Sequence, residues 1–232
     1  MIEAKEFIEA ARELGFVRYT GVPCSFLTPF INYVINDNAL EYIASTNEGD
    51  ALATTSGSVI GGQRSIVMMQ NSGLGNAVSP ITSLSYIFRI PFLIIVTHRG
   101  EPGVKDEPQH ELMGQITEEL FNTMQIPSET FPSETKEIIP ALQRAEKFMS
   151  KEHRPYAFIM KKGSITPQKL DKKMIKDIAK SETEIRSLFD EKLTRPNRNT
   201  VLRHIINHTS VDDSVLIATT GFTGRELFSI ND

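Results

Sequence analysis

The sequence predicts an α/β fold, with a doubly wound, mostly parallel sheet, helices on both faces, and the start of a second α/β domain. Segments typical of strands and helices alternate along the chain, which favours β-α-β units. The expected strands are almost wholly apolar, as suits a sheet covered on both faces. A hydrophobic content of 40% in 232 residues fits a globular chain with one full domain and part of another.

The first hundred residues supply four strands and their helices. Apolar residues at helical spacing predict a helix over 3–14, which Gly15 ends. The pattern then predicts a strand at 16–20, a helix at 26–35 with Ser25 as its N-cap, a strand at 40–44, a helix at 48–60, a strand at 65–69, a helix at about 77–88 and a strand at 92–97.

The rest of the chain continues the alternation and then changes character. We expect a polar loop at 99–110, a helix at 115–124, a short strand near 129, a helix at 135–150 and a strand at 156–160. Residues 166–195 are charged and poor in apolar side chains, which predicts a linker after a first domain at 1–165. A helix at 200–208, a strand at 215–218, a glycine turn at 219–221 and a helix from 224 follow. One such step cannot bury its own apolar face, so 196–232 is expected to be a truncated domain.

Composition excludes several classes of protein. A net charge of −4 without a long basic run gives no reason to expect nucleic acid. Cys24 is the one cysteine, which rules out a disulfide within the chain and fits a reducing cytoplasm. The longest apolar run, at 90–96, is too short to cross a membrane. We expect no metal site, because HExxH, CxxC and carboxylate clusters are missing from the sequence.

Polar or glycine-rich segments follow five of the predicted strands. In open α/β sheets, ligands bind beyond the carboxyl ends of the strands. The segments in question are 21–25, 47–50, 70–76, 98–110 and 219–224. Surface turns would explain each one separately, but their shared position predicts a common binding crevice.

Two of these segments contain candidate functional residues. Glu48 either stabilises a helix dipole from the first turn or serves as a carboxylate at the floor of the crevice. The segment 70–76 opens a helix with two glycines and three amide side chains, which would let a ligand approach the backbone closely. It matches neither GxGxxG nor GxxxxGK, so a nucleotide-binding dehydrogenase is disfavoured.

Five short runs, taken in order, resemble the thiamine diphosphate-dependent 2-oxo acid decarboxylases, in particular those for phosphonopyruvate and sulfopyruvate. These runs are Gly-Val-Pro-Cys-Ser at 21–25, Asn-Glu-Gly-Asp-Ala at 47–51, Asn-Ser-Gly-Leu-Gly-Asn at 71–76, Arg-Gly-Glu at 99–101 and Glu-Pro-Gln-His at 107–110. The resemblance covers nearly the whole chain. It implies the thiamine diphosphate-binding fold, with a pyrimidine-binding domain at 1–165 and part of a diphosphate-binding domain at 196–232. It also implies a homodimer or higher homo-oligomer with the active site between subunits.

The resemblance also implies roles for individual residues. Glu48 would share a proton with the aminopyrimidine ring of the cofactor and so act in catalysis. Further cofactor contacts would come from Asn71, Ser72, Gly73, Asn76, Thr219, Thr220 and Gly221. The small anionic 2-oxo acid would be held by Ser25, Asn47, Arg99 and His110. His110 is also a candidate for moving protons.

The cofactors implied are thiamine diphosphate and Mg²⁺. The family's Mg²⁺ motif, which begins Gly-Asp-Gly, is not found in these 232 residues. We therefore expect a chain truncated in its diphosphate domain that does not turn over substrate alone. The leading reaction is decarboxylation of 3-phosphonopyruvate to phosphonoacetaldehyde and CO₂. The alternatives are sulfopyruvate, another 2-oxo acid such as pyruvate, or a non-catalytic binding module of the same fold.

Overall fold

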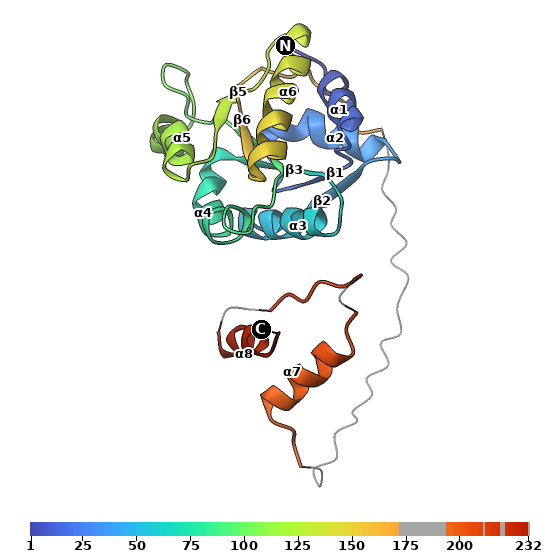
Figure 1. Cartoon of the computed structure of the whole chain (residues 1–232). Helices are drawn as coiled ribbons and strands as arrows, with labels where there is room; N and C mark the ends of the chain where they lie inside the picture. Colours follow the sequence, from blue (N-terminus) through green and yellow to red (C-terminus); the bar gives the residue numbers. More distant parts are fainter. Residues whose placement is uncertain (172–193, 211, 219–220, 232) are drawn as a thin grey trace. The chain divides into compact units, whose positions relative to one another are not determined.

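The computed structural model describes residues 1–171, 194–210, 212–218 and 221–231 (Figure 1). The chain divides into two compact units, Met1–Lys176 and Asp177–Asp232. Among the described residues, no helix is both long enough and apolar enough to cross a membrane.

The first unit is built on one six-stranded sheet in which every neighbouring pair is parallel, in the order β2-β1-β3-β4-β6-β5. The strands are β1 (Arg18–Gly21), β2 (Glu41–Ala44), β3 (Ser65–Gln70), β4 (Leu93–Thr97), β5 (Ser128–Thr130) and β6 (Tyr156–Met160). Every residue of β4 and β6 is buried, as their unbroken apolar sequences predict. The order turns back between β1 and β3, and ligand-binding crevices of doubly wound sheets lie at such a switch point.

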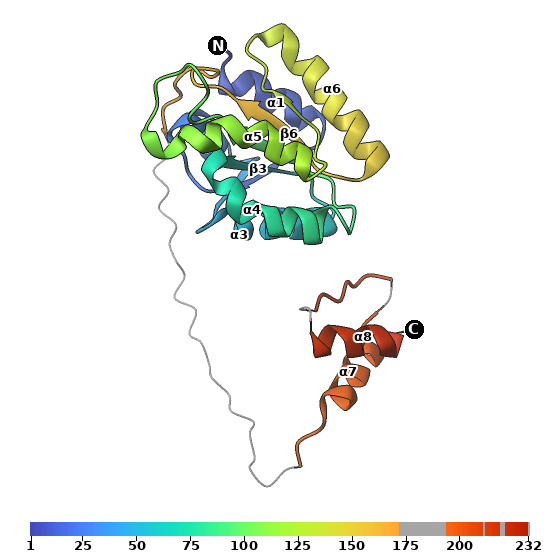
Figure 2. The same ribbon diagram turned by 90° about the vertical axis from the view of Figure 1, so that its left-hand side faces the viewer.

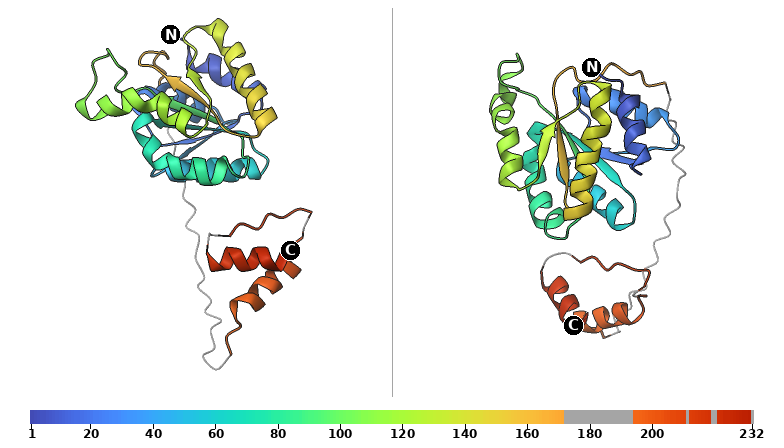
Figure 3. Two further views of the ribbon diagram at one scale, coloured as in Figure 1. Left: turned by 60° about the vertical axis from the view of Figure 1, so that its left-hand side comes forward. Right: turned by 45° about the horizontal axis from the view of Figure 1, so that its top comes forward.

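Helices cover both faces of this sheet, which confirms the predicted doubly wound fold (Figures 2 and 3). One face carries α1 (Ala4–Glu13), α2 (Thr28–Asn36) and α6 (Thr135–Glu152), and the other carries α3 (Glu48–Ile60), α4 (Leu74–Pro80) and α5 (Glu111–Thr123). Each layer closes its own hydrophobic core. The first contains four contacting rings, Phe7, Phe30, Phe131 and Phe158, and the second centres on aliphatic side chains of β3 and β4.

Three helices of the first unit begin two or more residues from where the sequence predicts. Ser25 is not an N-cap, because 25–27 forms a 3₁₀ turn and α2 begins at Thr28 with Pro29 in its first turn, where a missing N–H costs nothing. The helix predicted at 77–88 begins at Leu74 and passes at Pro80 into a π-helical turn, Ile81–Ser85. Proline lacks the N–H that the α-helical ladder needs, and the widened turn follows it. Helix α5 begins at Glu111, four residues before its prediction.

The second unit contains α7 (Arg198–Asn207) and α8 (Phe222–Asn231), joined by two hydrogen bonds between the side chains of Arg198 and Glu226 at 2.7 and 2.9 Å. The strand predicted at 215–218 is wrong, since those residues pair with no strand in the described part of the chain. Without a partner strand, the backbone has no ladder to join. Val215 and Ile217 are accordingly 66% and 77% exposed.

Candidate active site at the carboxyl ends of the strands

Four of the five predicted segments lie at one edge of the sheet. They follow β1, β2, β3 and β4. In the strand register β1 and β2 end together, at Gly21 and Ala44, and β3 and β4 end together, at Gln70 and Thr97, two residues beyond the Met68 that pairs with Gly21. The parallel arrangement therefore gathers these segments as the sequence predicts. The fifth segment, 219–224, belongs to the second unit, and its first two residues, Thr219 and Thr220, lie outside the described residues.

Glu48 is held where the first turns of α3 and α4 meet. Asn47 caps α3, since its Oδ1 accepts a hydrogen bond from the backbone N–H of Asp50 at 3.1 Å. The amide of Asn76 donates to Glu48 Oε2 at 2.8 Å. A Cβ atom at position 73 would lie 2.3 Å from Glu48 Cδ, so Gly73 is the residue that lets this carboxylate lie against the backbone. Within the described residues, Glu48 Oε1 accepts no hydrogen bond, which leaves it available to a ligand.

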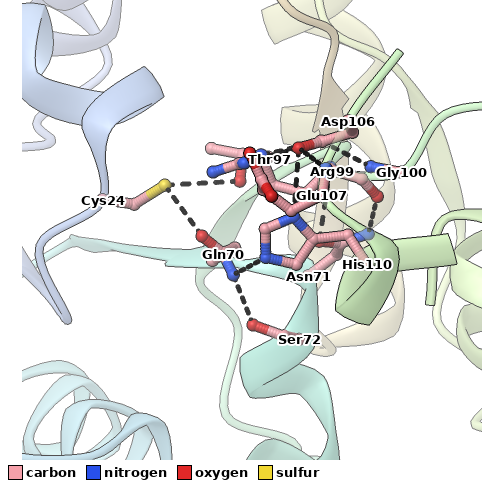
Figure 4. Close-up of polar contacts among 10 residues, drawn as sticks. All are labelled: Cys24, Gln70, Asn71, Ser72, Thr97, Arg99, Gly100, Asp106, Glu107 and His110. Atoms are coloured by element: carbon pink, nitrogen blue, oxygen red, sulfur yellow. Dashed lines mark hydrogen bonds and ion pairs between the residues drawn. The ribbon is translucent and has the colours of Figure 1, made fainter. Parts of the chain in front are cut away.

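A second group, which we call the Asp106 cluster, consists of Asp106, Arg99, Gly100, Glu107 and His110 (Figure 4). Arg99 donates from Nε and Nη2 to the two Asp106 oxygens at 2.8 and 2.5 Å. The backbone N–H groups of Gly100 and Glu107 donate to the same carboxylate at 2.8 Å each, and His110 Nδ1 lies 3.2 Å from Asp106 Oδ1. The Arg99 guanidinium holds the pKa of Asp106 well below its ordinary value, so this carboxyl is ionised.

The other nitrogen of the His110 ring faces the end of β3. Its Nε2 lies 3.4 Å from Gln70 Nε2, which also donates to Ser72 Oγ at 2.6 Å. Gln70 Oε1 in turn accepts from the thiol of Cys24, with an S···O distance of 3.4 Å (Figure 4). The contacts thus run without a break from the end of β1 to the loop after β4.

Asn71 holds the loop after β4 in place through side-chain hydrogen bonds. Its side chain is fully buried, and Nδ2 donates to the Arg99 carbonyl at 2.8 Å and to Thr117 Oγ1 at 3.0 Å. Its Oδ1 accepts from the Arg99 N–H at 3.3 Å. Gly100 adopts φ +70°, and a Cβ there would lie 2.0 Å from the His110 carbonyl oxygen. Glycine at 100 therefore allows the loop to turn back against α5.

The predicted site residues thus fall into separate groups. Asn47, Glu48, Gly73 and Asn76 meet at one point, while Asn71, Ser72, Arg99 and His110 belong to the network around Asp106 and Gln70. Ser25 lines a pocket of about 350 Å³ together with Phe26 and Lys161. Gly221 lies in the second unit with φ +140°. The roles predicted for all of these residues stay predictions.

Sequence reasoning missed Asp106, Gln70 and Cys24 as members of this network. Gln70 lies in the segment 70–76, and its position directly after an apolar strand is the feature that marks it. Asp106 lies in the irregular loop 98–110, where no periodicity marks which carboxylate turns inward. Among the described residues, no group of three or more His, Cys, Asp or Glu side chains could hold a metal ion.

Comparison with known proteins agrees with the resemblance in the sequence. No family model matches the chain. Phosphonopyruvate decarboxylases from Streptomyces viridochromogenes and Streptomyces hygroscopicus are 36% and 35% identical to it over 232 residues, which is 100% of this chain and 58% and 57% of theirs. The chain therefore spans less than three fifths of their length. Sulfopyruvate decarboxylase subunit alpha from Methanococcus maripaludis is 38% identical over 133 residues, 56% of this chain and 79% of that subunit.

Solved structures agree on the fold. Benzoylformate decarboxylase from Polynucleobacter necessarius has a TM-score of 0.58 at 16% identity, covering 89% of this chain and 36% of that one. The thiamine diphosphate-dependent 4-hydroxybenzoylformate decarboxylase from Rhodococcus jostii RHA1 has a TM-score of 0.52 at 16% identity, covering 69% and 30%. At 16% identity these structures support the fold alone. The matches at 36% and 38% identity confirm the resemblance to the decarboxylases for phosphonopyruvate and sulfopyruvate. The chain belongs to the family of phosphonopyruvate decarboxylases and sulfopyruvate decarboxylase alpha subunits.

Proposed function

We propose that this chain carries the pyrimidine-binding part of a thiamine diphosphate- and Mg²⁺-dependent decarboxylase that converts 3-phosphonopyruvate to phosphonoacetaldehyde and CO₂. The observation that carries the proposal is the extent of the match. The chain aligns over all 232 residues with two phosphonopyruvate decarboxylases, whereas the sulfopyruvate alpha subunits align over 133 to 144 residues.

The surroundings of Glu48 fit one end of the cofactor. A carboxyl group beside an aminopyrimidine ring can exchange a proton with a ring nitrogen. Asn76 fixes one oxygen of Glu48, and the other accepts no hydrogen bond in the described part of the chain. When bound, thiamine diphosphate supplies the nucleophilic carbon and the electron sink for the loss of CO₂. The Mg²⁺ ligands would come from residues other than those described.

The test is a product assay on the full protein that carries this chain, with thiamine diphosphate and Mg²⁺ and with phosphonopyruvate, sulfopyruvate and pyruvate side by side. We expect phosphonoacetaldehyde as the main product. Glu48→Gln keeps the size of the side chain but removes its ability to take up and release a proton, and should lower kcat by about 10²–10⁴-fold. Glu119→Gln, at an exposed position of α5, is the matched control. Full activity of the Glu48 variant would contradict the mechanism.

Sulfopyruvate is the second candidate substrate. The supporting observation is that the Methanococcus maripaludis alpha subunit is 38% identical to this chain over its matched region. The phosphonopyruvate decarboxylase from Streptomyces viridochromogenes is 36% identical. The same assay separates the two substrates. We further propose a cytoplasmic homodimer or larger homo-oligomer with a site shared between subunits. The test uses two inactive variants, each with a substitution in a different half of the site. If the site is shared between subunits, mixing the two variants should restore part of the activity.

A further inference from the structure

Every group that contacts Asp106 in the Asp106 cluster is a hydrogen-bond donor or can be one. Four contacts come from Arg99 and from two backbone N–H groups, none of which can accept a hydrogen bond. The fifth comes from His110 Nδ1, which lies 3.2 Å from Asp106 Oδ1. Because the carboxylate is ionised, it offers only acceptors to that ring.

This arrangement fixes the protonation pattern of the His110 ring. If Nδ1 lacked a proton, its lone pair would point at a carboxylate oxygen, and the two would repel each other. Nδ1 must therefore carry the proton, and in the neutral ring Nε2 carries the lone pair. The amide of Gln70 agrees, since its Nε2 faces the His110 Nε2 at 3.4 Å while its Oε1 is engaged by Cys24.

We propose that Asp106 is a positioning residue that holds His110 as the Nδ1-protonated tautomer, so that the basic Nε2 faces the end of β3. The inference rests on the proposed function, because it gives His110 a proton-accepting nitrogen at the carboxyl edge of the sheet. A carboxylate that sets the tautomer of a histidine in this way acts through the ring and does not itself touch the substrate. His110 is 8% exposed, and each of its ring nitrogens faces a partner, Asp106 Oδ1 on one side and Gln70 Nε2 on the other.

The same geometry changes the role of Arg99. Both Asp106 oxygens accept from its guanidinium, and its Cζ lies 4.9 Å from the centre of the Phe26 ring. The positive charge of Arg99 is thereby neutralised at close range. Arg99 thus acts as part of the support for Asp106, rather than as a free cation for the anionic group of the substrate.

Nitrogen-15 NMR of the histidine rings tests the tautomer in the full protein without any need for activity. His98 serves as an internal reference with the opposite pattern: its Nε2 lies 2.7 Å from the Gly114 carbonyl, and its Nδ1 has no partner among the described residues. We expect Nδ1–H for His110 and Nε2–H for His98, with each signal assigned by its loss in the His110→Gln or His98→Gln variant. A neutral His110 protonated on Nε2 would overturn the proposal.

Kinetics of Asp106→Ala give an independent readout. We expect kcat to fall at least about tenfold, with His110 shifting towards Nε2–H and the affinity for thiamine diphosphate almost unchanged. Asp37→Ala removes another arginine-paired aspartate, the partner of Arg12, and should leave kcat as it is. An unchanged kcat in the Asp106 variant would overturn the proposal. If that variant fails to fold, the nitrogen-15 NMR spectrum of the wild-type protein tests the tautomer by itself. A wild-type protein inactive on all three substrates would refute the proposed function but not the tautomer.

Discussion

Gly73 and Gly75 stand two residues apart at the start of one helix, yet they differ in what a methyl group would meet. A Cβ at 73 would lie 2.3 Å from three atoms of the Glu48 side chain, whereas a Cβ at 75 would meet nothing within 4 Å. Neither residue has a positive φ, so alanine strains the backbone at neither position. The sequence motif contains two glycines, but the structure gives only the first a role in placing the carboxylate.

We predict that Gly73→Ala displaces Glu48 and lowers decarboxylase activity strongly while the protein stays folded. The displaced group is the end of a flexible side chain, so the change should cost little stability. Gly75→Ala is the control and should leave activity intact, with a gain of about 0.5–1 kcal/mol in stability from helix propensity. Activity and thermal unfolding of the two variants in the full protein check the prediction, and equal activity in both would contradict it.

At the scale of the elements, Asn71 connects the end of β3 with the loop after β4 and with α5 through hydrogen bonds of its side chain. Asn71→Ala removes three hydrogen bonds and leaves the Arg99 backbone and the Thr117 hydroxyl without them. Unsatisfied buried groups cost about 1–3 kcal/mol, so the free energy of unfolding should fall by that amount. Urea denaturation measures it, with Asn122→Ala at an exposed position of α5 as control. A loss no greater than that of the control would show that water replaces these bonds.

The loop after β4 should also have a defined response to acid. Arg99 lowers the pKa of Asp106 in the folded state below its ordinary value of 3.8. A group with a lowered folded pKa stabilises the protein fully above its unfolded pKa and loses that contribution as the pH falls towards the folded value. The difference in unfolding free energy between wild type and Asp106→Asn should therefore stay constant from about pH 7 to 5 and shrink only below about pH 4. A difference that shrinks already between pH 7 and 5 would contradict this reading.

The sequence predicts an element well when neighbouring residues determine where the element begins and ends. Both ends of α3 are predicted correctly, because Asn47 caps it and Gly61 ends it within the local sequence. The start of α4 is not, because a 3₁₀ turn and Pro80 shift the helical pattern away from simple periodicity. The strand predicted at 215–218 shows the same limit, since an apolar run becomes a strand only beside a partner.

The candidate site follows the same rule. Its location could be predicted, because parallel strands bring their carboxyl ends to one edge whatever the loops contain. Glu48 could be predicted because it opens a helix directly after a strand. The part played by Asp106 could not, because a polar loop carries no pattern that distinguishes its carboxylate from that of Glu101, which pairs with Lys161, or from that of Glu107, which is exposed. Only the folded loop brings Asp106 to Arg99 and His110.

At the scale of the whole molecule, both hydrophobic cores are made of residues between Ile2 and Ile165. The chain after β6 returns to α1 and α2 before it leaves the first unit. Ile2 and Ile165 form a parallel bridge with hydrogen bonds at 3.0 and 2.9 Å on either side. Asn32 and Asn36 of α2 then hold the backbone at 168–171. Residues 164–171, which the sequence assigns in part to a linker, are therefore fastened to the sheet unit.

This predicts where the chain can be cut. A chain that ends after residue 176 keeps both cores and the fastened segment, and should unfold cooperatively at the temperature of the sheet unit in the 232-residue chain. A chain that ends after residue 163 loses Ile165, whose burial alone contributes about 1.5–3 kcal/mol, and the bridge to Ile2. Its melting temperature should fall by several degrees. Calorimetry of the three chains compares them directly. Equal melting temperatures for the two shortened chains would mean that residues 164–171 lie against the sheet unit without stabilising it.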